Sequence, residues 1–369
     1  FWDQPAIGSG QYVRALVAAL ACMEEIDPLL VDGDPLEAPP PPGVELWRCG
    51  RSAAGNLSKL WFEQVGFPRA CRRSGCVVAH VPYFAPPLAC PVPLVVTIHD
   101  LIPMLLPEYR GGLHVRAYMA LAASAARRAT LVVADSAATA QDIERILGIP
   151  PERVRVVHLA AGDAYWPMPI DLVVALRQRL GLPERYLLYL GGFDRRKRVP
   201  ELLRAFHRVL PRLGDTGLVV AGRLPDRDSA FAPDPRRVAH ELAMGERVRF
   251  LGQVDEADKP ALYAGAEALV FPSVYEGFGL PPLEALSCGT PVIATQSSSL
   301  PEVVGDAGIL VPPDDVGALA EAIYALMDDS ARRRELAGRA LVQANRFSWE
   351  RTAEKTAAIY REAAARGHK

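Results

Sequence analysis

The sequence is poor in aromatic side chains, in excess charge and in long apolar runs. Aromatic residues make up 7% of the 369 residues, and 41 Lys and Arg stand against 43 Asp and Glu, a net charge of -2. This balance gives no electrostatic reason to expect binding to nucleic acid. No apolar run reaches the roughly 20 residues that span a bilayer, and no charged segment precedes a short apolar one as in a signal peptide. We therefore expect a cytoplasmic protein, with a peripheral contact at the inner face of a membrane left open.

The cysteines lack the pattern of a metal or redox site. No CxxC pair occurs, and no histidine stands at ligand spacing from the 6 cysteines. We expect reduced thiols that pack as small hydrophobic groups. Two Asp-x-Asp triplets, at 32–34 and 226–228, suggest a metal-dependent transferase of another fold. Such triplets arise often by chance in loops, and both lie beside prolines, so this alternative is the weaker one.

What the chain does have is short β-branched runs, each followed by a helical pattern. Continuous apolar strands that alternate with amphipathic helices favour parallel sheets covered on both faces. With 369 residues, 50% of them hydrophobic, the chain is long enough for two such domains at roughly 100–200 residues each. The expected strands lie at 77–80, 94–98, 131–134, 154–158, 186–190, 218–221, 248–251, 268–271, 292–294 and 309–311.

The alternation of strands and helices breaks at residues 165–169. Two prolines and no periodicity there indicate a linker between domains. We predict an N-terminal domain over 1–166, a second domain over 167–347 and a helix within 348–369. Two α/β domains with a cleft between them is the architecture that this division favours.

The most informative segment is FPSVYEGFGLPPLEA at 271–285, which follows an apolar strand and runs into a helix. Gly277 and Gly279 allow positive φ and a close approach of the backbone to a ligand. The start of the following helix suits a phosphate or a hydroxyl-rich group. Glu276 and Glu284 would repel an anion, so we expect them to face neutral groups such as sugar hydroxyls. A capping glutamate and a solvated glutamate would explain the same pattern without a ligand.

A second cluster, LGGFDRRKR at 190–198, also follows a strand. Gly191 and Gly192 at the strand's carboxyl end, followed by fixed cations, suit a diphosphate, because arginine binds phosphate as a fork and lysine as a point charge. A solvated basic turn is the better explanation for Arg195 and Arg198, but not for Lys197.

Two further motifs lie in the first half. His99 and Asp100 end an apolar strand, the place where α/β sheets bind ligands, although a lone histidine is more often structural. Gly8 and Gly10 stand before an expected helix over 13–21, at the spacing of a dinucleotide loop. Because Val13 occupies the position of that loop's third glycine, we exclude NAD binding and expect a glycine turn beside a substrate.

These motifs resemble those of the retaining family-4 glycosyltransferases of the GT-B fold, in which two Rossmann-like, doubly wound domains face each other across a cleft. The spacing Glu276-x7-Glu284, continued into 287–293, resembles the family's donor signature. Residues 191–197 resemble its donor-phosphate segment, and 299–308 its later donor-domain stretch. In the first half, 7–12 and 99–103 resemble the acceptor-side glycine loop and His-Asp turn of its mannosyltransferase-like branch.

The resemblance implies a role for each motif. Glu276 would hold hydroxyls of the transferred sugar and Glu284 the ribose, while Arg196 and Lys197 would stabilise the leaving diphosphate. The implied catalytic residues are Glu276, His99, Lys197 and Arg196. The implied donor-binding residues are Gly191, Gly192, Arg196, Lys197, Glu276, Gly277, Phe278, Gly279, Leu280 and Glu284. The implied acceptor-side residues are Gly8, Gly10, Tyr12, His99 and Asp100. The tail helix would pack back on the N-terminal domain.

The activity that the resemblance implies is transfer of a hexose from a nucleoside-diphosphate sugar to a glycan or lipid-linked acceptor hydroxyl. The anomeric configuration would be retained, and neither a cofactor nor a catalytic metal would be needed. GDP-mannose is the favoured donor, with UDP-sugars next. A nucleotide-sugar 2-epimerase of the same architecture, or a sugar-nucleotide-binding protein without turnover, are the alternatives.

The sequence departs from the family pattern at two places. The family's first strand should precede Gly8, and the sequence begins at Phe1, too close to supply it. Gly192 stands where some relatives have an arginine, so we assign the second phosphate-binding cation to Arg196.

Overall fold

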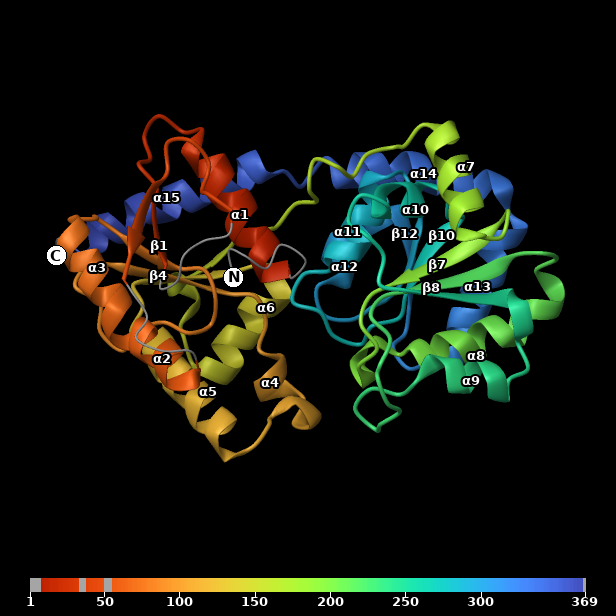
Figure 1. Cartoon of the computed structure of the whole chain (residues 1–369), viewed down its shortest axis with the longest axis horizontal. Coiled ribbons are helices and arrows are strands. Elements are labelled where there is room, and N and C mark those ends of the chain that lie inside the picture. The colour runs from red at the N-terminus through yellow and green to blue at the C-terminus, as the bar shows by residue number, and fades with distance from the viewer. Residues whose placement is uncertain (1–7, 33–37, 50–54, 368–369) are drawn as a thin grey trace. The chain divides into compact units, whose positions relative to one another are not determined.

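Parallel strands alternate with helices along the chain, and the resulting sheets fall into two separate units (Figure 1). The computed structural model describes residues 8–32, 38–49 and 55–367. The first unit contains Phe1–Leu159 and Ser348–Lys369, and the second contains Ala160–Phe347. The change of unit thus falls before the proline-containing segment 165–169.

The first unit is built on a parallel sheet in the order β3-β4-β5-β6. These strands are β3 Ala79–Val81, β4 Leu94–Ile98, β5 Leu131–Ala134 and β6 Val154–Val156. Helices cover both faces of the sheet. Val96 of β4 belongs to a core that includes Ala126 of helix α5, whereas its neighbour Val95 belongs to a core that includes Ile359 of helix α15. Burial on both faces is why β4 and β5 are almost entirely apolar, whereas the outer strands β3 and β6 carry His80 and Arg155.

The remaining elements of the first unit surround that sheet. The tail helix α15 packs on helix α1 as well as on β4. Strands β1 and β2 form a separate two-stranded parallel sheet. The elements are α1 Gly8–Ala21, β1 Leu29–Asp32, β2 Glu45–Arg48, α2 Asn56–Trp61, α3 Phe67–Ser74, α4 Ile102–Leu105, α5 Leu113–Ala126, α6 Ala137–Asp142 and α15 Trp349–Gly367.

The second unit holds a six-stranded parallel sheet in the order β12-β11-β10-β7-β8-β9. The strands are β7 Tyr186–Leu190, β8 Gly217–Ala221, β9 Val248–Gly252, β10 Ala268–Phe271, β11 Val292–Thr295 and β12 Gly308–Val311. The chain winds outwards from β7 in one direction and from β10 in the other, so this is a doubly wound sheet. Its strand order reverses between β7 and β10, the place where such sheets bind ligands.

Helices cover both faces of this sheet, with α8, α9 and α13 on one side and α7, α10 and α11 on the other (Figure 1). In α8 the buried residues Val199, Leu202, Leu203 and Phe206 recur at helical spacing, which fixes the face that it presents to the core. The helices are α7 Ile170–Leu180, α8 Val199–Val209, α9 Pro235–Glu241, α10 Lys259–Ala264, α11 Leu280–Ser287, α12 Leu300–Val304, α13 Val316–Asp328 and α14 Ser330–Ala344.

All ten expected strands are present, and β4, β5, β7 and β10 have the expected bounds. Strands β1 and β2 were not predicted, because each has four residues and lies beside proline-rich sequence. The expected turn at Gly8 and Gly10 is wrong: both residues lie in the first turns of α1 and not in a loop before it. Glycine is tolerated there because the first turn of a helix carries few of its hydrogen bonds.

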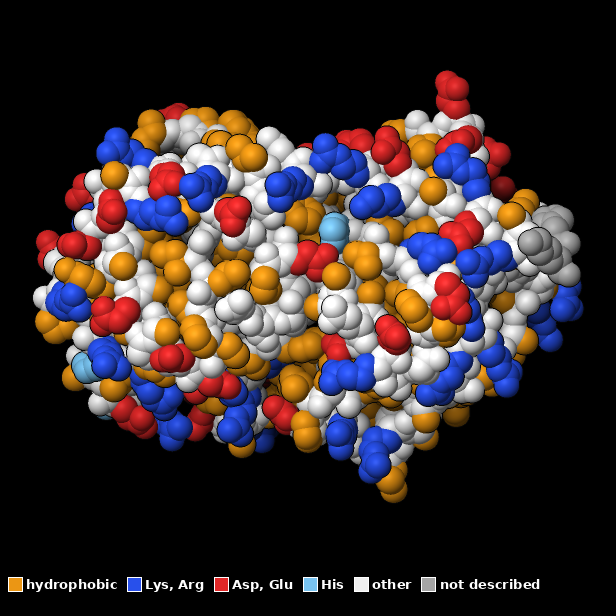
Figure 2. Space-filling model, turned by 180° about the vertical axis from the view of Figure 1, so that it is seen from behind, with side chains coloured by type: hydrophobic (Ala, Val, Ile, Leu, Met, Phe, Trp, Pro, Cys, Tyr) orange, Lys and Arg blue, Asp and Glu red, His pale blue; other side chains and the backbone are white. Residues whose placement is uncertain are grey.

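The distribution of charged side chains and the state of the cysteines both agree with the sequence. Acidic and basic side chains are interspersed over the face shown in Figure 2. All six cysteines are free; Cys71 and Cys288 are buried and Cys22 is exposed. Within the described ranges, no helix is both long enough and apolar enough to cross a membrane.

Candidate active site

The strongest candidate site lies at the carboxyl ends of β7 and β10, at the point where the second unit's sheet reverses its order. After β7 the chain passes through Gly191 and Gly192 and makes one 3-10 turn over Arg195–Lys197. After β10 it runs through Glu276 and Gly279 into α11. Because β7 and β10 are paired neighbours, the two motifs found in the sequence meet at one edge of the sheet.

Arg196 and Lys197 grip the two oxygens of one carboxylate. The Nζ of Lys197 lies 2.6 Å from Oε1 of Glu276, and Nη1 of Arg196 lies 2.8 Å from its Oε2. Arg196 also donates to the backbone carbonyl of Tyr275 at 2.5 Å and pairs with Asp194 at 3.4 Å. The Nζ of Lys197 stands 5.0 Å from the centre of the Phe271 ring, a cation–π contact.

These three side chains are nearly buried, with exposures of 10% for Arg196, 11% for Lys197 and 12% for Glu276. Burial favours the neutral acid, but the charges of Lys197 and Arg196 outweigh it, so the pKa of Glu276 lies below its ordinary value. The cluster thus joins two cations, Arg196 and Lys197, with two carboxylates, Glu276 and Asp194. Arg195, the neighbouring cation, points outwards and is exposed.

Two serines after β11 hold the loop that follows β10 in place; Ser299 lies in the stretch 299–308 noted above, but the sequence assigned neither serine a role. The backbone N–H of Glu276 donates to Oγ of Ser298 at 2.8 Å. The buried Ser299 donates from its Oγ towards the carbonyls of Glu276, at 3.0 Å, and Phe278, at 2.6 Å. Both serines follow β11 and bond the loop that follows β10, so these contacts can be recognised only from the folded structure.

Glycine is required at two positions around the site. A Cβ on Gly222, which follows β8 with φ +136°, would stand 1.9 Å from the carbonyl oxygen of Gly191. Gly279 has φ +111° and forms the N-terminal cap of α11. The first helical residue is Leu280, and the buried Phe278 packs edge-on against Phe347. Gly222 was missed because one glycine after a strand is a weak signal.

The second glutamate of the motif is not part of the Arg196–Lys197 cluster. Glu284 lies in α11, is 5% exposed, and accepts a hydrogen bond of 2.8 Å from the hydroxyl of Tyr263. The Tyr165 hydroxyl contacts the same carboxylate. Burial is the main cause that raises the pKa of Glu284 above its ordinary value, so the two carboxylates of the motif differ in environment.

In the first unit, three polar groups directly follow three adjacent strands. His99 follows β4, Asp135 follows β5 and Pro82 follows β3. The Nδ1 of His99 is 2.6 Å from Oδ2 of Asp135, and its Nε2 is 3.1 Å from the carbonyl oxygen of Pro82. The carboxylate partner of His99 is therefore Asp135, 36 residues away, and not its neighbour in the sequence, Asp100.

The other acceptor-side residues have structural contacts. Asp100 accepts a hydrogen bond of 3.0 Å from the backbone N–H of Ile102, at the start of α4. Tyr12 is 1% exposed, so it lies inside the unit; its hydroxyl bonds Thr97, and its ring stands edge-on to His99 at 4.9 Å. Gly10 is buried beside it, and Gly8 is exposed.

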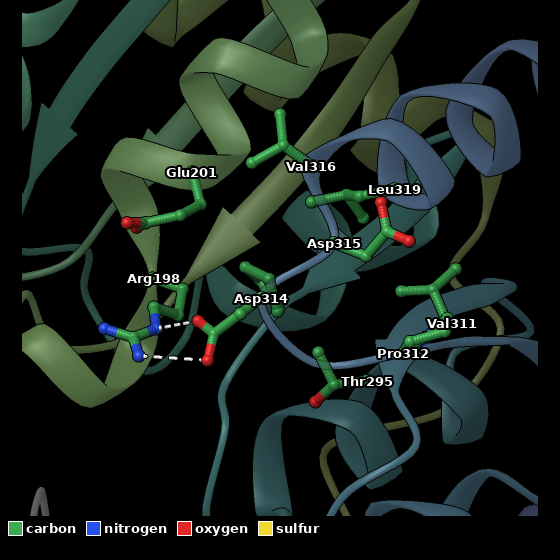
Figure 3. Close-up of a pocket in the computed structure, with 10 residues that line it drawn as sticks. Arg198, Glu201, Thr295, Val311, Pro312, Asp314, Asp315, Val316 and Leu319 are labelled. Carbon is green, nitrogen blue, oxygen red and sulfur yellow. Dashed lines mark hydrogen bonds and ion pairs between the residues drawn. The ribbon is translucent and has the colours of Figure 1, made fainter.

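A small pocket in the second unit is lined by 10 residues that do not include Arg196, Lys197 or Glu276 (Figure 3). They lie at or just after the carboxyl ends of β10, β11 and β12 and at the starts of α8 and α13. The one cation in its lining, Arg198, is paired with Asp314 at 2.6 Å. Of the two Asp-x-Asp triplets, Asp228 pairs with Arg237 and accepts from the backbone of Asp234, and the triplet at 32–34 extends outside the described residues.

Solved structures with this architecture define the class of protein. Sucrose-phosphate synthase from Thermosynechococcus elongatus is 26% identical, with a TM-score of 0.76 over 97% of this chain and 94% of that one. Anabaena Alr3699/HepE in complex with UDP and glucose is 20% identical, with a TM-score of 0.75 over 97% and 96%. Two Rossmann-like parallel units of this kind are the GT-B fold of glycosyltransferases.

Sequence comparison gives the family. The model of "Glycosyl transferases group 1" matches residues 175–341, and that of "Glycosyltransferase Family 4" matches residues 7–160. O-antigen chain mannosyltransferase B of Escherichia coli is 35% identical over 72% of this chain and 70% of its own length. The chain belongs to the family-4 glycosyltransferases. It is also 31% identical to serotype-specific mannosyltransferase WbdA of Escherichia coli, over 69% of this chain but 32% of that longer protein.

Proposed function

We propose that the chain is a retaining hexosyltransferase that moves mannose from GDP-mannose to a hydroxyl of a glycan or lipid-linked acceptor, without a cofactor or catalytic metal. The main observation behind the proposal is that Arg196 and Lys197 both form ion pairs with Glu276. This cluster lies where the strand order of the second unit's sheet reverses, between β7 and β10. The mannosyltransferases among the relatives support mannose as the sugar.

In this proposal the second unit holds the donor. Arg196 and Lys197 bind the diphosphate, and Glu276 accepts hydrogen bonds from the hydroxyls of the sugar. Gly191, Gly192 and the backbone of 277–280 let the donor approach the main chain, and Glu284 binds the ribose hydroxyls. The acceptor oxygen attacks the anomeric carbon, the bond from that carbon to the phosphate oxygen breaks, and the hydroxyl proton passes to the leaving phosphate. Charge develops on that phosphate, which is where fixed cations lower the barrier.

The first unit supplies the acceptor side, with His99 at its centre. A lipid-linked acceptor requires access to a membrane surface, and one segment of this unit suits such contact. Leu113 and Val115 at the start of α5 are 78% and 42% exposed, and the exposed Arg110 and Arg116 stand beside them in the sequence. Exposed apolar side chains flanked by arginines are typical of a peripheral contact with anionic lipid.

The test is product analysis with the purified chain. GDP-mannose and UDP-glucose are each incubated with mannose-terminated oligosaccharides and with a lipid-linked sugar, with and without a chelator. We expect GDP release coupled to a new mannoside whose anomeric configuration matches that of the donor, at the same rate with chelator. Conversion of the donor to its 2-epimer, or binding with no product from any donor and acceptor, would contradict transfer.

Two variants of neighbouring cations test whether the proposed site residues matter for turnover. Lys197→Ala should lower turnover by about 100-fold, because one charge-assisted contact to the leaving group is lost. Arg195→Ala removes an exposed cation from the same turn and should leave turnover within about twofold. Equal turnover in the two variants would contradict the assignment of the site.

A further inference from the structure

His99 lies between two groups that can only accept a hydrogen bond. Its Nδ1 is 2.6 Å from the carboxylate of Asp135, and its Nε2 is 3.1 Å from the carbonyl oxygen of Pro82. A neutral imidazole carries one N–H, so it can donate to only one of these oxygens, and its other nitrogen would turn a lone pair towards an oxygen. An imidazolium donates to both.

Burial gives a second reason for charge on this ring. Asp135 is 2% exposed, and its Oδ1 has no hydrogen-bond partner among the described residues. A carboxylate taken out of water is costly unless a positive group neutralises it. The His99 ring, in contact with its other oxygen, supplies that positive charge when it is doubly protonated.

A neighbouring histidine shows the opposite environment. His80 of β3 contacts the hydroxyls of Tyr360, at 2.7 Å, and Thr97, at 2.8 Å. A hydroxyl can donate as well as accept, so both contacts suit a neutral ring. Burial, with the charge of His99 nearby, lowers the pKa of His80 to about 3. The two histidines of this unit therefore have hydrogen-bond partners that favour opposite charge states.

The groups around His99 agree with this assignment. Burial by itself disfavours the cation, but Asp135, the adjacent Asp100 and the Pro82 carbonyl outweigh it, so the pKa of His99 is raised. From α1 the Tyr12 ring meets it edge-on, and burial keeps the Tyr12 hydroxyl neutral by raising its pKa. His80, from β3, stays uncharged near neutral pH.

We propose that Asp135 is a positioning residue that holds His99 as an imidazolium, so that His99 serves transfer as a fixed positive charge and not as a proton acceptor. Its role in transfer rests on the proposed function; its charge state does not. With both N–H groups engaged, the ring has no lone pair to take the proton of an acceptor hydroxyl. A positive ring also suits a reaction whose leaving group gains negative charge.

The charge state is tested by NMR of the full chain labelled with ¹⁵N in its histidine rings, without substrate. His99→Gln assigns the signal. We expect both ring nitrogens of His99 to be protonated near neutral pH, while His80 stays neutral and serves as the internal reference. Asp135→Asn should lower the titration midpoint of His99 by about one pH unit or more, a tenfold loss of proton affinity.

Asp142→Asn is the matched control. Asp142 is a mostly buried carboxylate of the same unit, but it pairs with Arg145 at 2.5 Å, so its loss should leave the His99 midpoint unchanged. A His99 ring protonated on one nitrogen only would overturn the proposal. The wild-type spectrum decides this even where Asp135→Asn fails to fold.

The role in transfer is tested by the dependence of kcat/KM on pH. In the wild type the alkaline limb should follow the NMR midpoint of His99, and Asp135→Asn should move that limb to lower pH by the same interval. An alkaline limb that does not move with the NMR midpoint would overturn the role of the charge. If no donor gives transfer at any pH, the proposed function fails while the NMR result still stands.

Discussion

Lys197 donates a hydrogen bond of 2.6 Å to Glu276, although the two residues are 79 positions apart in the sequence. Their loops meet because β7 and β10 are neighbours at the point where the sheet of the second unit reverses its order. Arg196 completes the cluster on the other carboxylate oxygen. In the proposed function, the carboxylate that would hold sugar hydroxyls thus lies within hydrogen-bond distance of the two cations that would bind the diphosphate.

Replacing the carboxylate of Glu276 should slow chemistry more than it weakens binding. Glu276→Gln keeps the shape of the side chain but loses the charge that orients Lys197 and Arg196, so we expect kcat to fall by about 100-fold. KM for the donor should change by less than about fivefold, because both cations remain. Steady-state kinetics with GDP-mannose checks this, and an unchanged kcat would remove Glu276 from the active site.

Gly222→Ala should displace the loop after β7, which carries Gly191 and leads to Arg196 and Lys197. Its Cβ would stand 1.9 Å from the carbonyl oxygen of Gly191 at φ +136°, so the loop after β7 has to move. We expect a loss of several kcal/mol, about 3 or more, in the free energy of unfolding, together with loss of donor binding. Denaturant titration and calorimetry measure the two effects.

Gly214→Ala is the control for Gly222→Ala. Gly214 also has a positive φ, of +54°, but a Cβ there meets no atom within 4 Å. It should cost only about 1 kcal/mol and leave donor binding intact. Similar losses in both variants would show that the close approach of Gly222 to Gly191 is not what matters.

Ser299→Ala should loosen the loop that carries Glu276. The buried hydroxyl donates towards the carbonyls of Glu276 and Phe278, and alanine leaves both without it. We expect a loss of about 1–3 kcal/mol in the free energy of unfolding and a lower kcat. Ser287→Ala, which removes a half-buried hydroxyl that bonds within α11, should leave kcat unchanged. If Ser299→Ala and wild type have equal kcat, the loop does not depend on this serine.

The two glutamates of the motif should affect stability with opposite dependence on pH. The folded pKa of Glu276 lies below its ordinary 4.5, so its charge stabilises the fold above that pH and the contribution is lost as the pH falls through the folded pKa. The folded pKa of Glu284 is raised above 4.5, so its contribution is present below 4.5 and is lost as the pH rises through the folded pKa.

Unfolding by denaturant across this pH range measures both effects. The stability lost in Glu276→Gln should grow as the pH rises from about 3 to 5, whereas that lost in Glu284→Gln should shrink as the pH rises above about 4.5. Parallel curves for the two variants would contradict the difference in their environments.

Local patterns were enough to predict the ten strands of the two larger sheets, and the meeting of the two motifs that follow β7 and β10. The runs that became β5, β7 and β10 contain only hydrophobic residues because they are covered on both faces. Motifs at the carboxyl ends of neighbouring parallel strands had to meet at one edge of the sheet. The sequence did not predict Asp135 as the partner of His99, because that contact joins two strand ends 36 residues apart. The roles of Ser299 and Gly222 also depend on which loops lie beside them, which the sequence alone does not give.

The central claim is that the second unit binds a nucleoside-diphosphate sugar through Lys197 and Arg196. Isothermal calorimetry with GDP-mannose tests it most directly and needs no acceptor. We expect saturable binding by the wild type and by Arg195→Ala, and about 10- to 100-fold weaker binding by Lys197→Ala, the loss of one charge-assisted hydrogen bond. Equal affinity in Lys197→Ala and the wild type, or no binding of GDP-mannose or any UDP-sugar, would contradict the account.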